Sequence, residues 1–178
     1  MINIIDTNIY NLIFKWYSMP TTFIMIFISH LGSATVLILL CVVFAILFKN
    51  KKTAIFIMLN LAVVYLFNVL IKTIVARPRP QVLKLVHETS YSFPSGHAMV
   101  AAGFYGFLIY IAYKNIKDKK VRNSIIVFLS LLIFLIGISR IYLGAHYATD
   151  IMGGFVIGAI YLVGFIKFYE KSKITLKK

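Results

Sequence analysis

The chain has 178 residues, 61% of them hydrophobic, and its mean hydropathy is +0.90. A soluble domain is about 45–50% apolar, and the excess here falls in long apolar runs between short charged stretches, a pattern that argues against a soluble protein. The formal net charge of +14 comes mainly from lysines between these runs and in the tail, which indicates membrane orientation rather than nucleic-acid binding. A lone cysteine, Cys41, excludes a disulfide within the chain.

The apolar runs predict an all-α integral membrane bundle of about six transmembrane helices, in one domain over residues 1–178. Lys15 and Pro20 interrupt the first run, so part of it is expected to lie along the membrane interface. The candidate spans are Asn8–Ile28, Ala34–Phe48, Thr53–Val75, His97–Tyr113, Asn123–Ile138 and Ala145–Phe168.

Basic residues concentrate in three regions, Lys49–Lys52, Lys114–Arg122 and Lys167–Lys178. With six spans these regions share one side, which the positive-inside rule makes cytoplasmic. The chain is therefore expected to be a multi-pass protein of the cell (cytoplasmic) membrane with a cytoplasmic C-terminus. The loops Ala76–Gly96 and Ser139–Gly144 then face the extracytoplasmic side. If the first run does not span, only the N-terminus changes side.

Positive charge also occurs on the outer side, where this topology disfavours it. Lys72 ends a span, and the Arg-Pro-Arg-Pro that contains Arg77 and Arg79 follows it along an extended path set by the prolines. Arg140 precedes the last span. Charges in such places mark a functional site; the alternative is that Arg77 and Arg79 bind lipid headgroups at the interface.

The segment Phe-Pro-Ser-Gly-His comes directly before a span. Ser95 is suited to cap that helix, Gly96 allows close approach, and a free helix N-terminus binds anions. His146 and Asp150 are four residues apart, so they share a helical face, and the carboxylate can hold the imidazole in one tautomer. His97 can approach an anion bound there from the side opposite His146.

These parts suit phosphoryl transfer, in which positioned cations stabilise charge on the phosphoryl oxygens. Lys72, Arg79 and Arg140 can converge on one anion, and the arginine fork matches phosphate oxygens. The acidic residues are too few and scattered for a carboxylate metal cage, so no metal and no other cofactor is predicted. Each part alone has an ordinary structural explanation; their combination on one side of a membrane indicates a phosphate site.

The three motifs resemble the signature of the type 2 phosphatidic acid phosphatase family, which is Lys-x6-Arg-Pro, Pro-Ser-Gly-His and Ser-Arg-x5-His-x3-Asp. Lys72–Pro80 fits the first motif, Pro94–His97 the second and Ser139–Asp150 the third, without a departure. The short chain and the loop Leu85–Glu88 are similar to the bacterial phosphatidylglycerophosphate phosphatase B and undecaprenyl pyrophosphate phosphatase branches. The resemblance implies a six-helix bundle with its site near the outer leaflet.

The resemblance also implies residue roles. His146 would be the nucleophile and form a phosphohistidine, Asp150 would orient it, and His97 would protonate the leaving oxygen and then help to activate water. His87 and Glu88 are candidate headgroup contacts, or else ordinary solvated loop residues. The residues implied to hold the phosphate are Lys72, Arg79, Ser95, Gly96, His97 and Arg140.

The expected partners are the bilayer and a membrane lipid phosphate: phosphatidylglycerophosphate, undecaprenyl pyrophosphate or phosphatidic acid. Broad specificity is expected because the loop between the first two motifs is short. Two alternatives stay open, a lipid phosphotransferase and a non-catalytic lipid-phosphate-binding protein, although the latter has no need of His146 beside Asp150. Gly154 and Gly158 predict close helix packing in the last span.

Overall fold

The computed structural model describes residues 4–48, 50–82 and 84–175, without the side chains of 173–175. Within these ranges the regular secondary structure is all α-helical, as predicted, with no strand. Lys49, Lys177 and Lys178 of the expected basic regions lie outside the described residues. The helices are α1 (Ile4–Phe14), α2 (Met19–His30), α3 (Ala34–Leu47), α4 (Lys51–Val75), α5 (Gly96–Asn115), α6 (Lys119–Tyr142) and α7 (Ala148–Thr175).

Four of the helices, α4, α5, α6 and α7, are long and apolar enough to cross a membrane. The innermost is α5, which packs against the other three. Of its apolar stretch 56% is buried, against 33%, 28% and 22% in α4, α6 and α7. The other helices therefore turn many large apolar side chains outward, as a bundle solvated by lipid does.

Small residues let α7 approach α5 closely, as the Gly-x3-Gly step predicts. A Cβ added at Gly158 would lie 2.7 Å from the carbonyl oxygen of Met99, and one at Gly154 would lie 3.0 Å from that of Ser95. The close packing allows the Ser95 N–H to donate to the Asp150 carbonyl oxygen at 3.1 Å. The second and third motifs are thus joined through the backbone.

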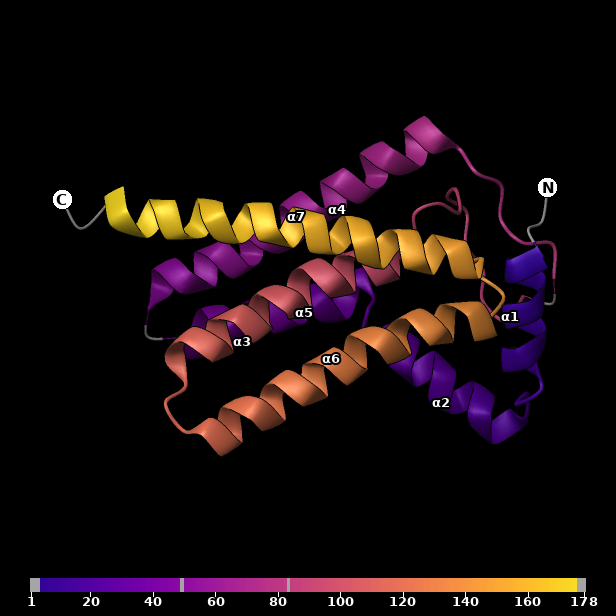
Figure 1. Ribbon diagram of the computed structural model, residues 1–178, viewed down its shortest axis with the longest axis horizontal. Helices are drawn as coiled ribbons and strands as arrows, with labels where there is room; N and C mark the ends of the chain where they lie inside the picture. The colour runs from indigo at the N-terminus through magenta and orange to yellow at the C-terminus, as the bar shows by residue number, and fades with distance from the viewer. Residues whose placement is uncertain (1–3, 49, 83, 176–178) are drawn as a thin grey trace.

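The expected first span, 8–28, is wrong as one continuous helix. It consists of α1 and α2, which meet at 120° around residues 15–18. The break has a local cause: the Ser18 side chain accepts from the Thr21 N–H and caps α2, and Pro20 occupies the first turn of α2, where its missing N–H costs nothing. In Figure 1, α1 lies across one end of the bundle, and α2 and α3 then follow one another toward the other end.

The two ends of the bundle carry different segments (Figure 1). The start of α4, the α5–α6 connection and the end of α7 gather at one end, which is therefore rich in lysine. The segments 76–82, 84–95 and 143–147 lie at the other end with α1. The fold thus gathers the basic regions at one end and the motif loops at the other, as the charge pattern predicted. All three motifs meet at the end opposite the lysines.

Candidate active site

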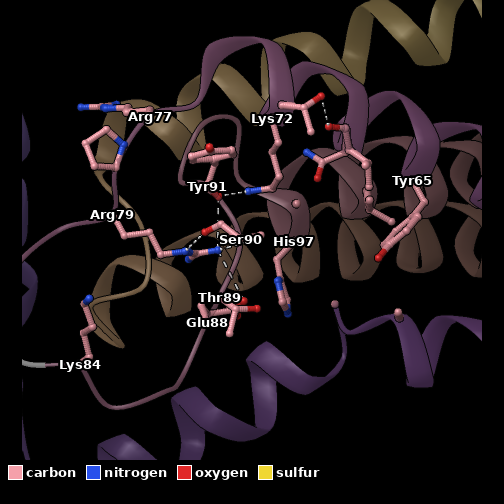
Figure 2. Close-up of a pocket in the computed structure, with 18 of the residues that line it drawn as sticks. Tyr65, Lys72, Arg77, Arg79, Lys84, Glu88, Thr89, Ser90, Tyr91 and His97 are labelled. Atoms are coloured by element: carbon pink, nitrogen blue, oxygen red, sulfur yellow. Dashed lines mark hydrogen bonds and ion pairs between the residues drawn. The ribbon is translucent and has the colours of Figure 1, made fainter.

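A cavity of about 870 Å³ opens at the motif end of the bundle. It is polar on the side of the motif loops and continues between α3 and α4 toward apolar residues. Figure 2 shows Lys72 from α4, His97 from α5, and Arg79 and Glu88 from the loop between these helices around the cavity. Three separate parts of the sequence therefore contribute ionisable side chains to one space.

Lys72 lies near the end of α4 and is buried. Its Nζ donates to the carbonyl oxygens of Tyr91 at 2.5 Å and Ser92 at 3.4 Å, so the loop before the second motif is tied to the first. One turn later Ala76 adopts a left-handed conformation with φ of 48°, which ends α4 and sends the following Arg-Pro-Arg-Pro across the site.

Arg79 bridges the loop and the third motif. Its Nε donates to the Ser90 carbonyl at 2.6 Å and its Nη1 to the Ala145 carbonyl at 2.7 Å. The same Nη1 lies 3.4 Å from Nε2 of His146. Burial lowers the pKa of Arg79 from its ordinary value, which Glu88 partly offsets, yet an arginine keeps its charge near neutral pH.

Arg140, at the end of α6, is 3% exposed. Its Nη1 donates to Ser29 Oγ at 2.6 Å, its Nη2 pairs with Glu88, and its Nε has no hydrogen-bond partner. Glu88 also lies 3.5 Å from Arg79. Two arginines predicted to bind phosphate therefore share one carboxylate, which shows that they can hold a single anion between them.

His146 is buried in the turn between α6 and α7. Its Nδ1 lies 3.6 Å from Asp150 Oδ2 and 3.4 Å from Ser92 Oγ. Because arginine has no acceptor, the contact of Arg79 with Nε2 means that Nε2 is the unprotonated nitrogen and Nδ1 carries the hydrogen. This is the tautomer in which Nε2 can attack an electrophile.

The buried position of His146 also sets its charge. The pKa of His146 is lowered to about 4, chiefly by burial and in addition by Arg79, Arg140 and Lys72, while the hydrogen bond with Asp150 opposes this shift. The imidazole is therefore neutral at pH 7, as a nucleophile must be.

Asp150 is completely buried in the first turn of α7. Its Oδ2 accepts from Ser92 Oγ at 2.5 Å and from the Tyr147 N–H at 2.9 Å, while its Oδ1 accepts from Arg77 Nη1 at 2.6 Å. Both carboxylate oxygens are thus held in place, and Oδ2 faces the imidazole of His146.

His97 occupies the first turn of α5 and lines two cavities, the large one and a second of about 230 Å³ that Arg140 also lines. Ser95 caps this helix through the Ala98 N–H at 3.4 Å, as predicted. A Cβ added at Gly96 would lie 3.0 Å from Asn68 Oδ1, so glycine permits the close approach expected there. The start of α5 therefore presents its imidazole and its free N–H groups to the anion site.

The two candidate headgroup residues are placed differently. Glu88 lines both cavities and is engaged by the arginines. His87 is exposed and lies outside these two linings. Among the residues that the structure describes, no three His, Cys, Asp or Glu side chains are arranged to hold a metal ion.

Several residues of the site escaped the sequence analysis. Ser92 follows no motif rule, although it precedes the second motif by two positions. Arg77 was noted as a misplaced charge but not as the partner of Asp150. Asp6 is an acidic residue in an apolar N-terminal segment, which is the signal that could have identified it.

A family model described as the PAP2 superfamily matches residues 53–174. Phosphatidylglycerophosphatase B of Bacillus subtilis (strain 168) is 36% identical over 150 residues, covering 82% of this chain and 74% of that protein. An undecaprenyl-diphosphatase of Sulfolobus acidocaldarius is 23% identical over 161 residues, covering 87% and 73%.

Two solved structures have a similar fold, and one of them is also a phosphatidylglycerolphosphate phosphatase from Bacillus subtilis. The crystal structure of a transmembrane PAP2 type phosphatidylglycerolphosphate phosphatase from Bacillus subtilis matches with a TM-score of 0.85 and 32% identity, over 93% of this chain and 85% of that one. Aquifex aeolicus LpxE matches with a TM-score of 0.69 and 25% identity, over 90% and 94%. The chain therefore belongs to the PAP2 superfamily and is a multi-pass membrane protein of this lipid phosphatase family.

Proposed function

We propose that the chain hydrolyses a lipid phosphate or lipid pyrophosphate through a phosphohistidine on His146, without a metal ion. The observation that carries this proposal is the orientation of His146. Its Nδ1 faces Asp150, and its unprotonated Nε2 faces Arg79, which lines the cavity. A phosphate bound by this arginine brings its phosphorus toward the nitrogen lone pair.

In the first step Nε2 of His146 attacks phosphorus, and the bond from phosphorus to the leaving oxygen breaks. Protonated His97 gives its proton to that oxygen, and Asp150 stabilises the positive charge that develops on His146. In the second step neutral His97 takes a proton from water, the water oxygen attacks the phosphohistidine, and inorganic phosphate leaves. Lys72, Arg79, Arg140, the Ser95 hydroxyl and the N–H groups of Gly96 and His97 hold the phosphoryl oxygens throughout.

Glu88 has a defined place in this scheme. Its carboxylate lies between Arg79 and Arg140, so an incoming phosphate displaces it from the arginines. The released carboxylate, with His87 on the same loop, is then the candidate contact for hydroxyl groups of the headgroup.

The substrate is a lipid because an apolar groove adjoins the phosphate cavity. A groove of about 440 Å³ runs between α3 and α4 and shares Ala34, Leu61 and Tyr65 with the larger cavity. A molecule with a phosphate head and an apolar tail fits this arrangement. With the names of the relatives, it favours phosphatidylglycerophosphate and undecaprenyl pyrophosphate, and we extend the proposal to phosphatidic acid.

The lysine-rich end of the bundle supports an orientation. We place the chain, as one domain, in the cell membrane with the lysine end and C-terminus in the cytoplasm and the site at the extracytoplasmic interface. Cysteines introduced at Thr89 and Lys117, in the Cys41→Ser background, test this in intact cells. An impermeant thiol reagent should label only the cysteine at position 89; labelling only at position 117 would reverse the orientation.

The activity is tested by phosphate release from a panel of purified lipid phosphates in mixed micelles, beside His146→Ala. We expect release from several substrates, none preferred by more than about a thousandfold, and none from the folded variant. EDTA should leave the rate unchanged. Activity in His146→Ala would refute the nucleophile, EDTA inhibition reversed by Mg²⁺ would refute the metal-free step, and transfer to an added lipid alcohol would indicate a phosphotransferase.

A further inference from the structure

We propose that Asp6, on α1, is a positioning residue of the reaction: through Arg77 and Thr149 it fixes the Asp150 carboxylate that orients His146. This inference rests on the proposed function of His146. Asp6 lies outside all three motifs and outside the part of the chain that the family model matches.

Asp6 is 2% exposed, and both of its carboxylate oxygens accept hydrogen bonds. Its Oδ1 accepts from the Thr149 N–H at 2.9 Å. Its Oδ2 accepts from Thr149 Oγ at 3.0 Å and from Arg77 Nη2 at 3.0 Å. A carboxylate at this place caps the start of α7, the helix whose first turn carries Asp150.

Arg77 continues the chain of contacts to the reaction centre. Its Nη1 donates to Thr149 Oγ1 at 2.8 Å and to Asp150 Oδ1 at 2.6 Å, and its guanidinium lies 4.2 Å from the ring centre of Tyr147. The Thr149 hydroxyl donates to Asp6 and accepts from Arg77, so each of its hydrogen-bonding roles is used. Arg77 is thereby held to Oδ1 of Asp150, while Oδ2, which accepts from Ser92 and the Tyr147 N–H, faces His146.

The charges of this network explain why an acid is needed at position 6. Asp150 alone offers one negative charge to His146, but the adjacent Arg77 cancels it. Asp6 neutralises Arg77, and the set of three therefore keeps a net charge of −1 behind the imidazole. That charge stabilises the positive charge that forms on His146 during attack.

The electrostatic surroundings of His146 involve several elements. Removing the negative charge of Asp6 changes the electrostatic potential at His146, to which charged groups on these elements also contribute. The direction in which the acid limb of kcat moves is therefore what identifies the contribution of Asp6. The other charged or titratable groups that act on His146 are Asp150 on α7, Arg140 on α6, Lys72 on α4, His97 on α5 and Arg79 in the loop.

The test is Asp6→Asn in the full-length chain, assayed with a lipid phosphate in mixed micelles. Asparagine keeps an acceptor for the Thr149 N–H, removes the charge, and replaces the oxygen that accepts from Arg77 and Thr149 Oγ1 with an amide NH2 group. We expect kcat to fall roughly 3- to 30-fold with little change in KM. The acid limb of kcat should move to lower pH, because a lost negative charge makes His146 harder to protonate. Arg77→Gln should move it to higher pH, and the double variant should not be additive.

Asp118→Asn is the matched control, since Asp118 also caps a helix, α6, but at the opposite end of the bundle. It should keep the wild-type kcat and acid limb. Wild-type kinetics in folded Asp6→Asn, or acid limbs that move the same way in Asp6→Asn and Arg77→Gln, would overturn the proposal.

Should Asp6→Asn not fold, Thr149→Val replaces it, because valine removes the hydroxyl link and keeps every charge. A loss of kcat at unchanged KM supports the proposal, and wild-type kcat overturns it. His146→Ala is measured beside these variants. If His146→Ala is active, the proposed function fails; if it is inactive while the Asp6 and Thr149 variants behave as wild type, only the role of Asp6 fails.

Discussion

The two ends of the bundle use positive charge in opposite ways. At the motif end Lys72 is 8% exposed and Arg140 3%, and oxygen atoms of the protein surround both. At the other end Lys117, Lys119 and Lys120 are exposed in a short connection between α5 and α6. Since burial of a charge is expensive, we expect the buried set to serve a ligand that offsets the cost, whereas the exposed set needs no partner beyond water and lipid headgroups.

The ends also differ in how their side chains are joined. The site joins α1, α6 and α7 through the loop between α4 and α5. Arg77 of this loop connects Asp6 on α1 to Asp150 on α7, and Glu88 of the same loop pairs with Arg140 on α6. Such a network holds reacting groups in place before substrate arrives, which is the main protein contribution to phosphoryl transfer. Function is therefore expected to be sensitive at one end and tolerant at the other.

The largest expected difference between the ends comes from removing one cation at each. Arg140→Ala should lower kcat/KM by about 10²- to 10³-fold, because the phosphate loses a preorganised donor and Glu88 loses a partner. Lys117→Ala should stay within about twofold of wild type. Both are measured as phosphate release by folded, monodisperse protein; equal losses would remove the contrast.

A smaller loss is expected for Ser92→Ala. The Ser92 hydroxyl donates to the charged Asp150, and such hydrogen bonds are worth about 1.5–3 kcal/mol. We predict a roughly 10- to 100-fold lower kcat with KM little changed. Ser130→Ala, at an exposed position of α6, is the control. A Ser92→Ala enzyme with normal kcat would mean that Asp150 and His146 need no help from this loop.

The pH dependence sharpens the contrast between a buried imidazole and solvated lysines. The pKa of His146 is lowered to about 4, so the neutral nucleophile is present above this pH and is lost as pH falls through it. Below that pH kcat/KM should fall about tenfold per unit, and it should also fall on the high-pH side, where His97 no longer holds the proton that it gives to the leaving oxygen. An acid limb near pH 6.5, or a flat profile with chemistry rate-limiting, would contradict these roles.

The smallest predicted effect separates packing from chemistry. Gly158→Ala places a methyl group 2.7 Å from the Met99 carbonyl oxygen, and we expect a cost of about 1–3 kcal/mol in stability with a partial loss of activity. Gly164→Ala meets nothing within 4 Å and should be neutral. Thermal unfolding in detergent measures both; equal midpoints would show that α5 and α7 do not need this close approach.

Much of this contrast could be predicted from the sequence because it depends on local patterns. The apolar runs predicted the long helices, and the positions of the lysines predicted which segments lie at each end of the bundle. The capping role of Ser95 and the close packing at Gly154 and Gly158 followed from short-range rules that the structure confirms. The site roles of His97 and His146 remain predictions that chemistry must test.

The features that the sequence did not predict depend mainly on contacts between segments that are far apart in the chain. No local sequence pattern encodes such contacts. Asp6 meets Thr149 across 143 positions, and only the packing of α1 on α7 brings them together. The interruption of the first run at Lys15 and Pro20 could be predicted, but the bend between α1 and α2 and the cap at Ser18 were not. Glu88 could be named as a loop acid but not as the carboxylate between two arginines.

The central claim is that His146 itself carries the phosphoryl group. The most direct measurement is to mix enzyme with a lipid phosphate, quench within milliseconds in alkaline detergent, in which phosphohistidine survives, and locate the modified residue by mass spectrometry. We predict one added phosphoryl group on His146, lost on acid treatment and missing in His146→Ala. A phosphoryl group on Ser92 or any other residue, or rapid turnover with no modified residue, would contradict the mechanism.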